Sequence, residues 1–581
     1  MNSSSLKGRW QTAIAAVATA LIFVIPGCGG GSTPEAAVPP VAAGPADMTC
    51  ADLNGATVDA GSIGLPTRGA SVTVTTSVVA GGGTGTGAYG AYCLVTGNIK
   101  PIDTSAPNIN FQVALPEEWN GKALMYGGSG TDGSIPSLSS PNLLWGMAAS
   151  PLPLGRGYAV FASDSGHQNQ PGVPNGAFAS NTEALKNYQG DALKKTRDVA
   201  ISLITARYAK APEKSYFWGY SRGGGEAMAV AQRWPADWDG VIAGAPGWNV
   251  TGVSLQMLAA TQAVAAPGAW LNQPKRQLLF QTVQGVCDGL DGVVDGVINN
   301  VRACAVQFNP LTASLAGTPL RCPCGVDTGN TCLSDAQLEA LKQINEPKAL
   351  SYALSSGETS LPGFPVYIAD NGGGTGTVGT MATLSSLGVF GSTPPAFPVT
   401  GAMASAWSQS DSWVRYSILG DPGFNSLLLD IGTGSGFASR FVAVSALDSN
   451  IMDISAFQES GGKLMMWIGT SDMLISPRAT EFLYSRMQSA MGPAKVDSFV
   501  RFYQIAGAQH GVSSMFQPDF DQLTAIENWA EKGIDPANNM IVTDTLGVPG
   551  RTRPVCQYPL WAKYKGSGDV NSAASFTCVS S

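Results

Sequence analysis

The chain has 581 residues, of which 44% are hydrophobic and only 13% charged, with a formal net charge of −8. It can bury a large core and is longer than one ordinary domain, so a large domain with an insertion or a second domain is expected. The acidic balance and the lack of a basic run argue against nucleic acid as a partner.

The N-terminus has the features of an export signal. Lys7 and Arg9 supply positive charge, and an apolar stretch follows over about residues 12–25. The segment then ends in Ile25-Pro26-Gly27-Cys28, which is similar to a lipobox, where Cys28 would become the lipidated first residue. A proline is atypical at its position in a lipobox, so simple cleavage and release is the alternative.

These features predict an exported protein. Residues 1–28 are interpreted as the signal peptide, and residues 29–47, rich in Gly, Pro and Ala, as a flexible tether. No later segment is long and apolar enough to span a bilayer, so a lipid on Cys28 is the only membrane contact expected. The predicted location is the periplasm or the outer membrane as a lipoprotein, or the medium after release.

A strand, a tight turn and a helix are predicted in the region of residues 216–231. An apolar aromatic run, residues 216–218, precedes Gly219-Tyr220-Ser221-Arg222-Gly223, and an Ala- and Met-rich segment follows at residues 227–231. In this context Gly-x-Ser-x-Gly is typical of a nucleophile elbow, which exposes a serine hydroxyl on a strained turn of an α/β-hydrolase sheet. The alternative is an ordinary Gly-rich turn, but the flanking elements favour Ser221 as a nucleophile.

Three carboxylates recur at short spacing between Asp288 and Val297. Asp288, Asp291 and Asp295 are separated by glycines that permit tight turns. Ca²⁺ takes several oxygen ligands, including backbone carbonyls, so this segment suits a structural calcium ion. The alternative is a series of Asx turns with solvated carboxylates, but a clamp by flanking cysteines favours the metal. No organic cofactor is expected.

An acid that could orient a catalytic base follows the next strongly predicted strand. The apolar run over residues 464–469 has the pattern of a buried parallel strand, and Thr470-Ser471-Asp472 comes directly after it. Alone, Asp472 could equally be a loop residue that caps the following turn. Other aspartates lie between the serine and the second histidine without ending a comparable strand, namely Asp430, Asp448 and Asp453.

A serine nucleophile needs a base, and the chain has only two histidines, His167 and His510. In α/β hydrolases the order along the chain is serine, then acid, then histidine. His510 obeys this order and follows an apolar strand-like run over residues 499–505. His167 precedes the serine in a polar loop, and it is interpreted as a side chain that orders this loop.

The ten cysteines suit an oxidising compartment. Cys28 belongs to the signal segment, so nine remain and one thiol is left over. Sequence alone does not determine the pairing, but short local loops favour four pairs: Cys50–Cys93, Cys287–Cys304, Cys324–Cys332 and Cys556–Cys578. Cys322 would then be free. A metal or redox role of Cys322-Pro323-Cys324 is disfavoured because the rest of a zinc site is missing.

Several stretches, spread over most of the mature chain, are similar to those of a known family. They are residues 117–122, 127–131, 214–217, 239–247, 288–295, 551–554 and 564–569. On these stretches the chain resembles the tannase/feruloyl esterase family. The resemblance implies an α/β-hydrolase fold with a large inserted lid domain, and the activity of a carboxylic ester hydrolase.

The resemblance also implies roles for individual residues. The family's catalytic triad falls on Ser221, Asp472 and His510. The backbone N–H groups of its oxyanion hole fall on Gly130 and Arg222. Its calcium ligands fall on the carboxylates of Asp288, Asp291 and Asp295 and on the carbonyls of Val293 and Val297.

The resemblance further implies how the chain divides. The catalytic domain would comprise residues 48–247 and 461–581. The lid domain, with the calcium loop, would comprise residues 248–460 and would cover the serine. We expect a monomer that binds a small aromatic ester.

Two departures from the family pattern bear on activity and substrate. The family usually has a disulfide between the residue before the serine and the residue after the histidine, which are here Tyr220 and Gly511. Packing must therefore hold the two segments together. Members that cleave a terephthalate monoester have an aromatic residue three positions after the acid, which is here Ile475, and a lid arginine in a context that this sequence lacks.

The predicted substrates are therefore feruloyl, galloyl or related hydroxyaromatic esters, with mono(2-hydroxyethyl) terephthalate or a related ester as the alternative. A catalytically inactive binding lipoprotein of hydrolase fold is the competing class, and the missing disulfide is the feature that favours it.

Overall fold

The computed structural model describes residues 47–83, 85–140, 146, 151–371, 388–400 and 403–580. The predicted signal peptide, nearly all of the predicted tether and Cys28 lie outside the described residues. Within the described ranges, no helix combines the length and the hydrophobicity needed to cross a membrane.

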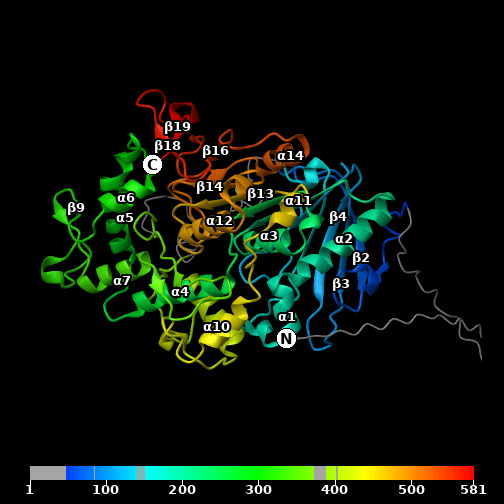
Figure 1. The fold of residues 1–581 in the computed structure, drawn as a ribbon, viewed down its shortest axis with the longest axis horizontal. Coiled ribbons are helices and arrows are strands. Elements are labelled where there is room, and N and C mark those ends of the chain that lie inside the picture. Colours follow the sequence, from blue (N-terminus) through cyan, green and yellow to red (C-terminus); the bar gives the residue numbers. More distant parts are fainter. Residues whose placement is uncertain are drawn as a thin grey trace, which may run out of the picture. The chain divides into compact units, whose positions relative to one another are not determined.

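A mixed sheet of ten strands forms the centre of the fold (Figure 1). Its strands lie in the order β1, β2, β3, β4, β6, β5, β7, β8, β13, β14. The neighbours from β1 to β6 pair antiparallel, and those from β6 to β14 pair parallel. The bounds are Thr57–Val58, Ala70–Val78, Tyr92–Ile99, Ile109–Pro116, Ala159–Ser163, Lys122–Tyr126, Lys214–Tyr220, Gly240–Gly244, Lys463–Gly469 and Val500–Ile505, in the order of the sheet.

The burial of each strand follows from its place in the sheet. The parallel strands β7 and β13 are buried along nearly their whole length, as apolar runs covered on both faces should be. The outer strand β2 is exposed at most of its positions beyond Val72. The helices that pack on the sheet are α2 (Ala192–Tyr208), α3 (Arg222–Arg233), α12 (Pro477–Met491) and α14 (Gln522–Lys532). The shorter helices α1 (Thr182–Lys186) and α13 (Pro493–Asp497) lie before α2 and β14.

Between β8 and β13 the chain leaves the sheet for more than two hundred residues. The helices of this excursion are α4 (Val250–Ala265), α5 (Gln273–Cys287), α6 (Val301–Gln307), α7 (Asp335–Asn345), α9 (Ser405–Ser412), α10 (Ala438–Ser445) and α11 (Ser455–Glu459). Side-chain oxygens of Asn249, Asn272 and Ser334 cap the N-termini of α4, α5 and α7. Its described strands are short pairs outside the main sheet: Ser314–Leu315 with Thr318–Pro319, and Lys348–Ala349 with Ser360–Leu361.

The excursion supplies most of a second hydrophobic cluster, while other parts of it join the cluster that surrounds the main sheet. Leu255 and Leu258 of α4 pack in this second cluster with Trp407 of α9 and with Trp413, apart from the cluster that surrounds the main sheet. A long insertion between two adjacent strands of the sheet is what the predicted lid requires. Its boundaries at residues 248 and 460 remain a prediction.

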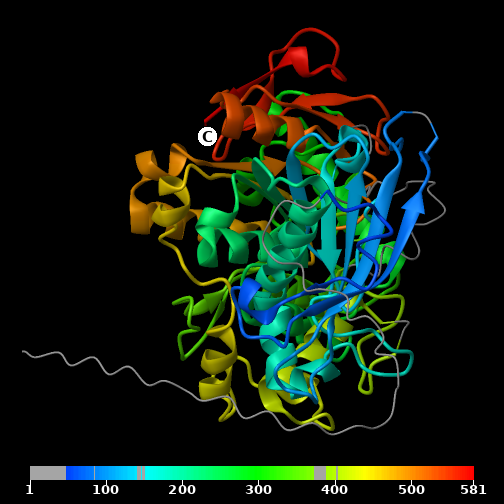
Figure 2. The same cartoon turned by 90° about the vertical axis from the view of Figure 1, so that its right-hand side faces the viewer.

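The C-terminal part of the chain adds two small sheets, orange to red in Figures 1 and 2. Strands β15 (Pro518–Asp519), β16 (Ile541–Asp544) and β17 (Thr552–Pro554) form the first, and β18 (Trp561–Tyr564) pairs with β19 (Phe576–Val579) in the second. The two sheets meet where β17 packs against β19.

Three of the four expected disulfides are formed: Cys50–Cys93, Cys287–Cys304 and Cys556–Cys578. The predicted pair of Cys324 with Cys332 is wrong, because Cys322 pairs with Cys332 and Cys324 is free and exposed. The Cys322 N–H donates to the Leu333 carbonyl at 2.8 Å, so Cys322 lies beside Cys332. Cys324 follows a proline in a left-handed turn with φ 52°, which removes it from this bridge.

Candidate active site

The serine of the predicted elbow lies in a strained turn between β7 and α3. Ser221 has φ 62° and ψ −120°, a conformation that residues with a side chain rarely adopt. The turn is held by its neighbours, since the Ser221 N–H donates to the Gly244 carbonyl at 2.9 Å and the Ser221 carbonyl accepts from the Gly247 N–H at 3.0 Å. This is the backbone geometry that the elbow motif predicts.

Glycines allow the elbow to be this tight. A Cβ at Gly219 would lie 2.0 Å from the Gly223 carbonyl oxygen, and a Cβ at Gly223 would lie 2.6 Å from the Gly128 carbonyl oxygen. Both distances are impossible for real atoms, so strand, helix and the 127–133 loop can meet only with glycine at these two positions. The motif therefore specifies close approach of three segments as well as a turn.

The structure brings Ser221, Asp472 and His510 together. His510 Nε2 lies 2.7 Å from Ser221 Oγ, and His510 Nδ1 lies 2.7 Å from Asp472 Oδ2. Asp472 is fully buried and His510 is 6% exposed. The second oxygen of Asp472 accepts the N–H groups of Leu474 and Ile475, each at 2.8 Å. A carboxylate fixed on both oxygens keeps the proton on Nδ1, which leaves Nε2 free to accept from the serine hydroxyl.

The residues proposed for the oxyanion hole also lie at this site. Gly130, at φ 58°, and Arg222, the first residue of α3, line the same cavity as Ser221. The cavity encloses about 50 Å³. Its other lining residues are Thr131, Tyr188, Gly247, Val250, Val253, Ser254, Met257, Gln409, Trp413, Leu474 and Ile475. The surroundings of Ser221 are thus mainly apolar and aromatic.

Arg222 is the charged residue in this lining, and its guanidinium is already engaged. It donates to the Tyr188 carbonyl and lies 4.2 Å from the centre of the Tyr188 ring. Its Nε also lies 4.0 Å from Asp132 Oδ2. Burial and the nearby Glu226 carboxylate raise the pKa of Asp132 well above its ordinary value. The arginine therefore belongs to a buried polar cluster behind the serine.

Tyr220 contributes a contact that sequence reasoning missed. Its hydroxyl donates to the His510 carbonyl at 2.9 Å, and its ring centre lies 5.2 Å from that of His510. Burial, followed by the charge of Asp472, raises the pKa of Tyr220 well above its ordinary value, so the hydroxyl stays protonated. Where the family usually has a disulfide, this chain joins the two segments by a hydrogen bond and a ring contact.

His167 contacts Thr131 and Tyr188, two residues that line the cavity at Ser221. It is 3% exposed, its ring stacks on Phe178 at 3.7 Å, and its Nε2 lies 2.9 Å from the Thr131 carbonyl oxygen. Burial lowers its pKa to about 4, so the ring is neutral at ordinary pH. These contacts agree with the interpretation of His167 as a loop-ordering residue.

The predicted calcium loop follows α5 and is closed by hydrogen bonds from its own backbone. The carboxylate of Asp288 accepts the Gly296 N–H, that of Asp291 accepts the Val293 N–H, and that of Asp295 accepts the Val297 N–H. Burial raises the pKa of Asp288, and it raises that of Asp291 to about 6. Among the described residues, no group of three or more His, Cys, Asp or Glu side chains is arranged to hold a metal ion.

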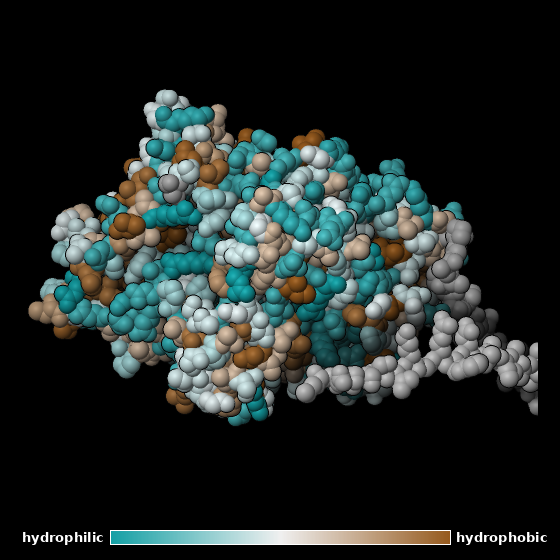
Figure 3. Space-filling view, in the orientation of Figure 1, coloured by the Kyte–Doolittle hydropathy of each residue, from teal (hydrophilic) through white to brown (hydrophobic). Residues whose placement is uncertain are grey.

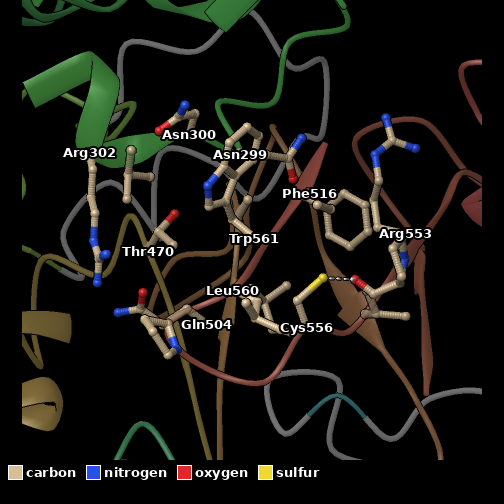
Figure 4. A pocket seen from close by; sticks show the side chains of 17 residues that line it. Asn299, Asn300, Arg302, Thr470, Gln504, Phe516, Arg553, Cys556, Leu560 and Trp561 are labelled. Atoms are coloured by element: carbon tan, nitrogen blue, oxygen red, sulfur yellow. Dashed lines mark hydrogen bonds between the residues drawn. The ribbon is translucent and has the colours of Figure 1, made fainter. Parts of the chain in front are cut away.

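Two residues outside the loop support it. The Asn299 side chain donates to Asp291 at 2.6 Å, and the Arg553 guanidinium donates to Asp295. Both side chains line a second cavity of about 50 Å³, where Figure 4 places them with Phe516. The sequence contained Arg553 within a recognisable stretch, residues 551–554, but gave no indication of its partner, which is 258 residues away.

The comparisons with known proteins agree with this geometry. A profile of the family described as tannase and feruloyl esterase matches residues 93–579. An uncharacterized esterase of Agrobacterium fabrum is 37% identical over 91% of this chain and 93% of its own length. The mono(2-hydroxyethyl) terephthalate hydrolase of Piscinibacter sakaiensis is 31% identical over 84% of this chain and 85% of its own length.

Solved structures of similar fold lead to the same family. Feruloyl esterase B from Aspergillus oryzae superposes with a TM-score of 0.69 at 22% identity, over 89% of this chain and 98% of its own. A tannin acyl hydrolase from Aspergillus niger superposes with a TM-score of 0.65 at 20% identity, over 93% of this chain and 97% of its own. These likenesses confirm the predicted α/β-hydrolase fold. The chain therefore belongs to the tannase and feruloyl esterase family and is a carboxylic ester hydrolase.

Proposed function

We propose that Ser221, His510 and Asp472 act as the nucleophile, base and orienting acid of this ester hydrolase. The observation that carries the proposal is the unbroken chain of 2.7 Å contacts from Asp472 through His510 to Ser221 Oγ. Ser221 Oγ attacks the ester carbonyl while His510 Nε2 takes its proton. The same proton then passes to the leaving alcohol, and an acyl-enzyme remains. Water, deprotonated by His510, releases the acid and restores the serine.

The negative oxygen of the tetrahedral intermediate needs hydrogen-bond donors. We propose the backbone N–H groups of Gly130 and Arg222, because both residues line the cavity with Ser221. Arg222 begins α3, so its amide also lies at the positive end of a helix dipole. Donors of this kind supply about 3–4 kcal/mol of transition-state stabilisation each in serine hydrolases.

The favoured substrates are esters of a neutral hydroxyaromatic acid, of the feruloyl or galloyl type. Trp413, Leu474 and Ile475 offer apolar surface for a ring, whereas Gln409 and Ser254 offer hydrogen bonds to ring hydroxyls. A free carboxylate on the substrate would need a cation, and the one described in this lining, Arg222, is held by Tyr188 and Asp132. The relatives named feruloyl esterase B are consistent with such substrates.

A terephthalate monoester is the second candidate, supported by the similarity to the hydrolase of Piscinibacter sakaiensis. Attachment to the membrane through a lipid on Cys28 is likewise proposed on the sequence Ile25 to Cys28. The four disulfides are those of an exported protein, either anchored or released.

The test is hydrolysis of four esters by the protein without residues 1–28: methyl ferulate, methyl gallate, mono(2-hydroxyethyl) terephthalate and p-nitrophenyl acetate. Each is run beside Ser221→Ala, which should lower kcat at least about 10³-fold because no other group can form the acyl-enzyme. The preferred ester locates the enzyme within the family. Equal turnover by Ser221→Ala would reject the triad, and no turnover of any ester by folded protein would favour the inactive binding protein.

We further propose a structural calcium ion at the loop from Asp288 to Val297. The donor set is one of hard oxygens, and two of its carboxylates, Asp288 and Asp291, are buried near the charge of Asp295. A divalent cation would relieve this repulsion. The carboxylates also accept N–H groups, so binding would require them to turn toward the ion.

Metal removal provides the corresponding prediction. Excess EDTA should lower the melting temperature, and added Ca²⁺ but not Mg²⁺ should restore it, because binding to the folded state alone is stabilising. Asp291→Asn should melt lower than the wild-type protein and should no longer respond to Ca²⁺. If neither EDTA nor Ca²⁺ changes the melting temperature of the wild-type protein, the loop is a set of Asx turns and the calcium proposal is rejected.

A further inference from the structure

We propose that His167 is a positioning residue for the oxyanion hole. Its Nε2–H holds the Thr131 carbonyl and thereby fixes the neighbouring Gly130 N–H toward Ser221. The inference rests on the proposed triad and oxyanion hole, and it gives a function to the histidine that the triad does not use. No contact joins His167 to the reacting groups, so it acts only through the loop.

The 127–133 loop is fastened at both of its ends. On the side of α3, the Gly128 N–H donates to the Glu226 carboxylate at 2.8 Å. On the other side, the Asn169 side chain donates to the Asp132 carbonyl at 2.7 Å, and the Ser165 hydroxyl donates to the Asp132 carboxylate at 2.6 Å. The loop is thus held between α3 and the segment 164–169.

The bond from His167 acts between these ends. Its acceptor, the carbonyl of Thr131, belongs to the residue directly after Gly130. The Thr131 carbonyl shares its planar peptide unit with the Asp132 N–H, which donates to the Ser129 carbonyl at 2.8 Å, and that carbonyl shares its peptide unit with the Gly130 N–H. The bond from His167 therefore restrains the Gly130 N–H through this turn. Gly130 has φ 58°, which glycine adopts about as readily as a negative φ, so its own conformational preference does not fix this turn.

The state of the ring is consistent with this single purpose. A carbonyl can only accept, so Nε2 must carry the proton, and Nδ1 is then a bare acceptor. In the described structure Nδ1 is buried without a hydrogen-bond partner. An unsatisfied buried nitrogen costs stability, and such costs concentrate at functional sites. Stacking on Phe178 fixes the ring plane, so that Nε2 points at Thr131.

The consequence concerns the transition state rather than substrate binding. Oxyanion donors must lie within about 0.2 Å of their place around 2.9 Å, because their contribution falls steeply with distance. Without the bond from His167 the turn from Ser129 to Asp132 would keep its internal hydrogen bond but lose the external donor that fixes its orientation. We expect kcat to fall about 10- to 100-fold with KM within about threefold of the wild type, since one donor is weakened and the acyl pocket is unchanged.

A matched series of variants distinguishes the effect of the hydrogen bond to Thr131 from the effect of the stacked ring. His167→Gln places an N–H donor at the Nε2 position, whereas His167→Asn carries the same amide one methylene too short to reach Thr131. His167→Phe keeps the stacking on Phe178 but has no donor. We expect His167→Gln to retain most of kcat, and both His167→Asn and His167→Phe to lose it, at similar melting temperatures.

A second readout tests the oxyanion hole directly. Phenylboronic acid forms a tetrahedral adduct with a catalytic serine and places an oxygen in the oxyanion hole, whereas the free product acid needs no oxyanion donor. The affinity for phenylboronic acid should fall in His167→Asn and His167→Phe by the same factor as kcat. The inhibition constant of the product acid should stay within about twofold.

The outcomes distinguish this inference from the proposed function. Turnover by Ser221→Ala would reject the triad itself. An inactive Ser221→Ala together with full kcat in His167→Asn and His167→Phe would leave the triad and overturn the role of His167. If His167→Phe keeps kcat while His167→Gln and His167→Asn lose it, the packing of the ring matters and the hydrogen bond to Thr131 does not, which would also overturn the proposal. If His167→Phe does not fold, the comparison of kcat between His167→Gln and His167→Asn still tests the proposal.

Discussion

Tyr220 links the strand that bears the serine to the segment that bears the histidine. Its hydroxyl bonds to the His510 carbonyl, and the two residues are 290 positions apart in the chain. Removal of this donor by Tyr220→Phe leaves a buried carbonyl without its partner, which typically costs about 1–3 kcal/mol. We expect a lower melting temperature and a kcat that falls a few fold, because His510 loses part of its support.

The chain offers a matched control for this prediction. Tyr503 on β14 is also fully buried, but its hydroxyl has no hydrogen-bond partner in the described structure. Tyr503→Phe should therefore leave the melting temperature and kcat unchanged or slightly raise the former. Equal effects of the two substitutions, in thermal melts and in ester hydrolysis, would mean that packing alone holds the two segments.

The three residues at the centre of the site could be predicted because each follows a strong local signal. Ser221, Asp472 and His510 all come after an apolar strand, and parallel strands bring their carboxyl ends to one edge. The bond from Tyr220 and the identity of the free cysteine could not be predicted. Both depend on contacts between segments that are distant in the chain or on local backbone conformation, and neither produces a periodic pattern in the sequence.

At the scale of elements, Glu358 joins two segments of the excursion that are distant in the chain. Its carboxylate accepts from Asn249, the residue that caps α4 just after β8, and from the Ser356 hydroxyl at 2.9 Å. The side chain is buried, and burial raises its pKa to about 7. At alkaline pH the ionised Glu358 carboxylate is therefore buried beside the N-terminus of α4.

The pH dependence of stability follows from this shift. The folded state binds a proton more tightly than the unfolded state, so Glu358 lowers stability as pH rises from about 4.5 to 7, and the penalty is complete above pH 7. Glu358→Gln removes the charge but keeps an oxygen acceptor. We expect this variant to be more stable at pH 8.5, by at most about 3 kcal/mol, and unchanged at pH 4.5.

Chemical denaturation at the two pH values measures the effect. Glu339→Gln on the exposed face of α7 removes the same charge from the surface, so it should change stability little at either pH. Glu358→Gln destabilising at pH 8.5 would show that the ionised form is favoured by its neighbours and would contradict the raised pKa.

The order of the elements could be predicted only in part. The sequence indicated the strands that precede Ser221, Asp472 and His510, because their apolar runs are short and bounded by turns. It did not indicate that β8 pairs with β13 across the excursion, or that β1 to β4 form an antiparallel half. Such pairings depend on packing between distant residues, for which local patterns carry little information.

For the whole molecule, the expectation of a monomer can be tested through the surface. On the face seen in Figure 3, hydrophobic side chains form small groups between polar ones. Exposed apolar residues such as Val79, Val306 and Leu428 are far apart in the chain. Single exposed hydrophobic residues are normal for a monomer, whereas stable interfaces need contiguous patches.

Cys324 is an exposed thiol, whereas the other cysteines of the described residues form four disulfides. In an oxidising solution two such thiols can join two copies without any other interface. We expect a covalent dimer on non-reducing gels after mild oxidation, and a monomer in gel filtration under a reductant that spares the buried disulfides. Cys324→Ser should stay monomeric and keep full turnover, because Cys324 does not line the cavity at Ser221. A dimer of Cys324→Ser would instead require a noncovalent interface, which the scattered hydrophobic groups of the visible face do not provide.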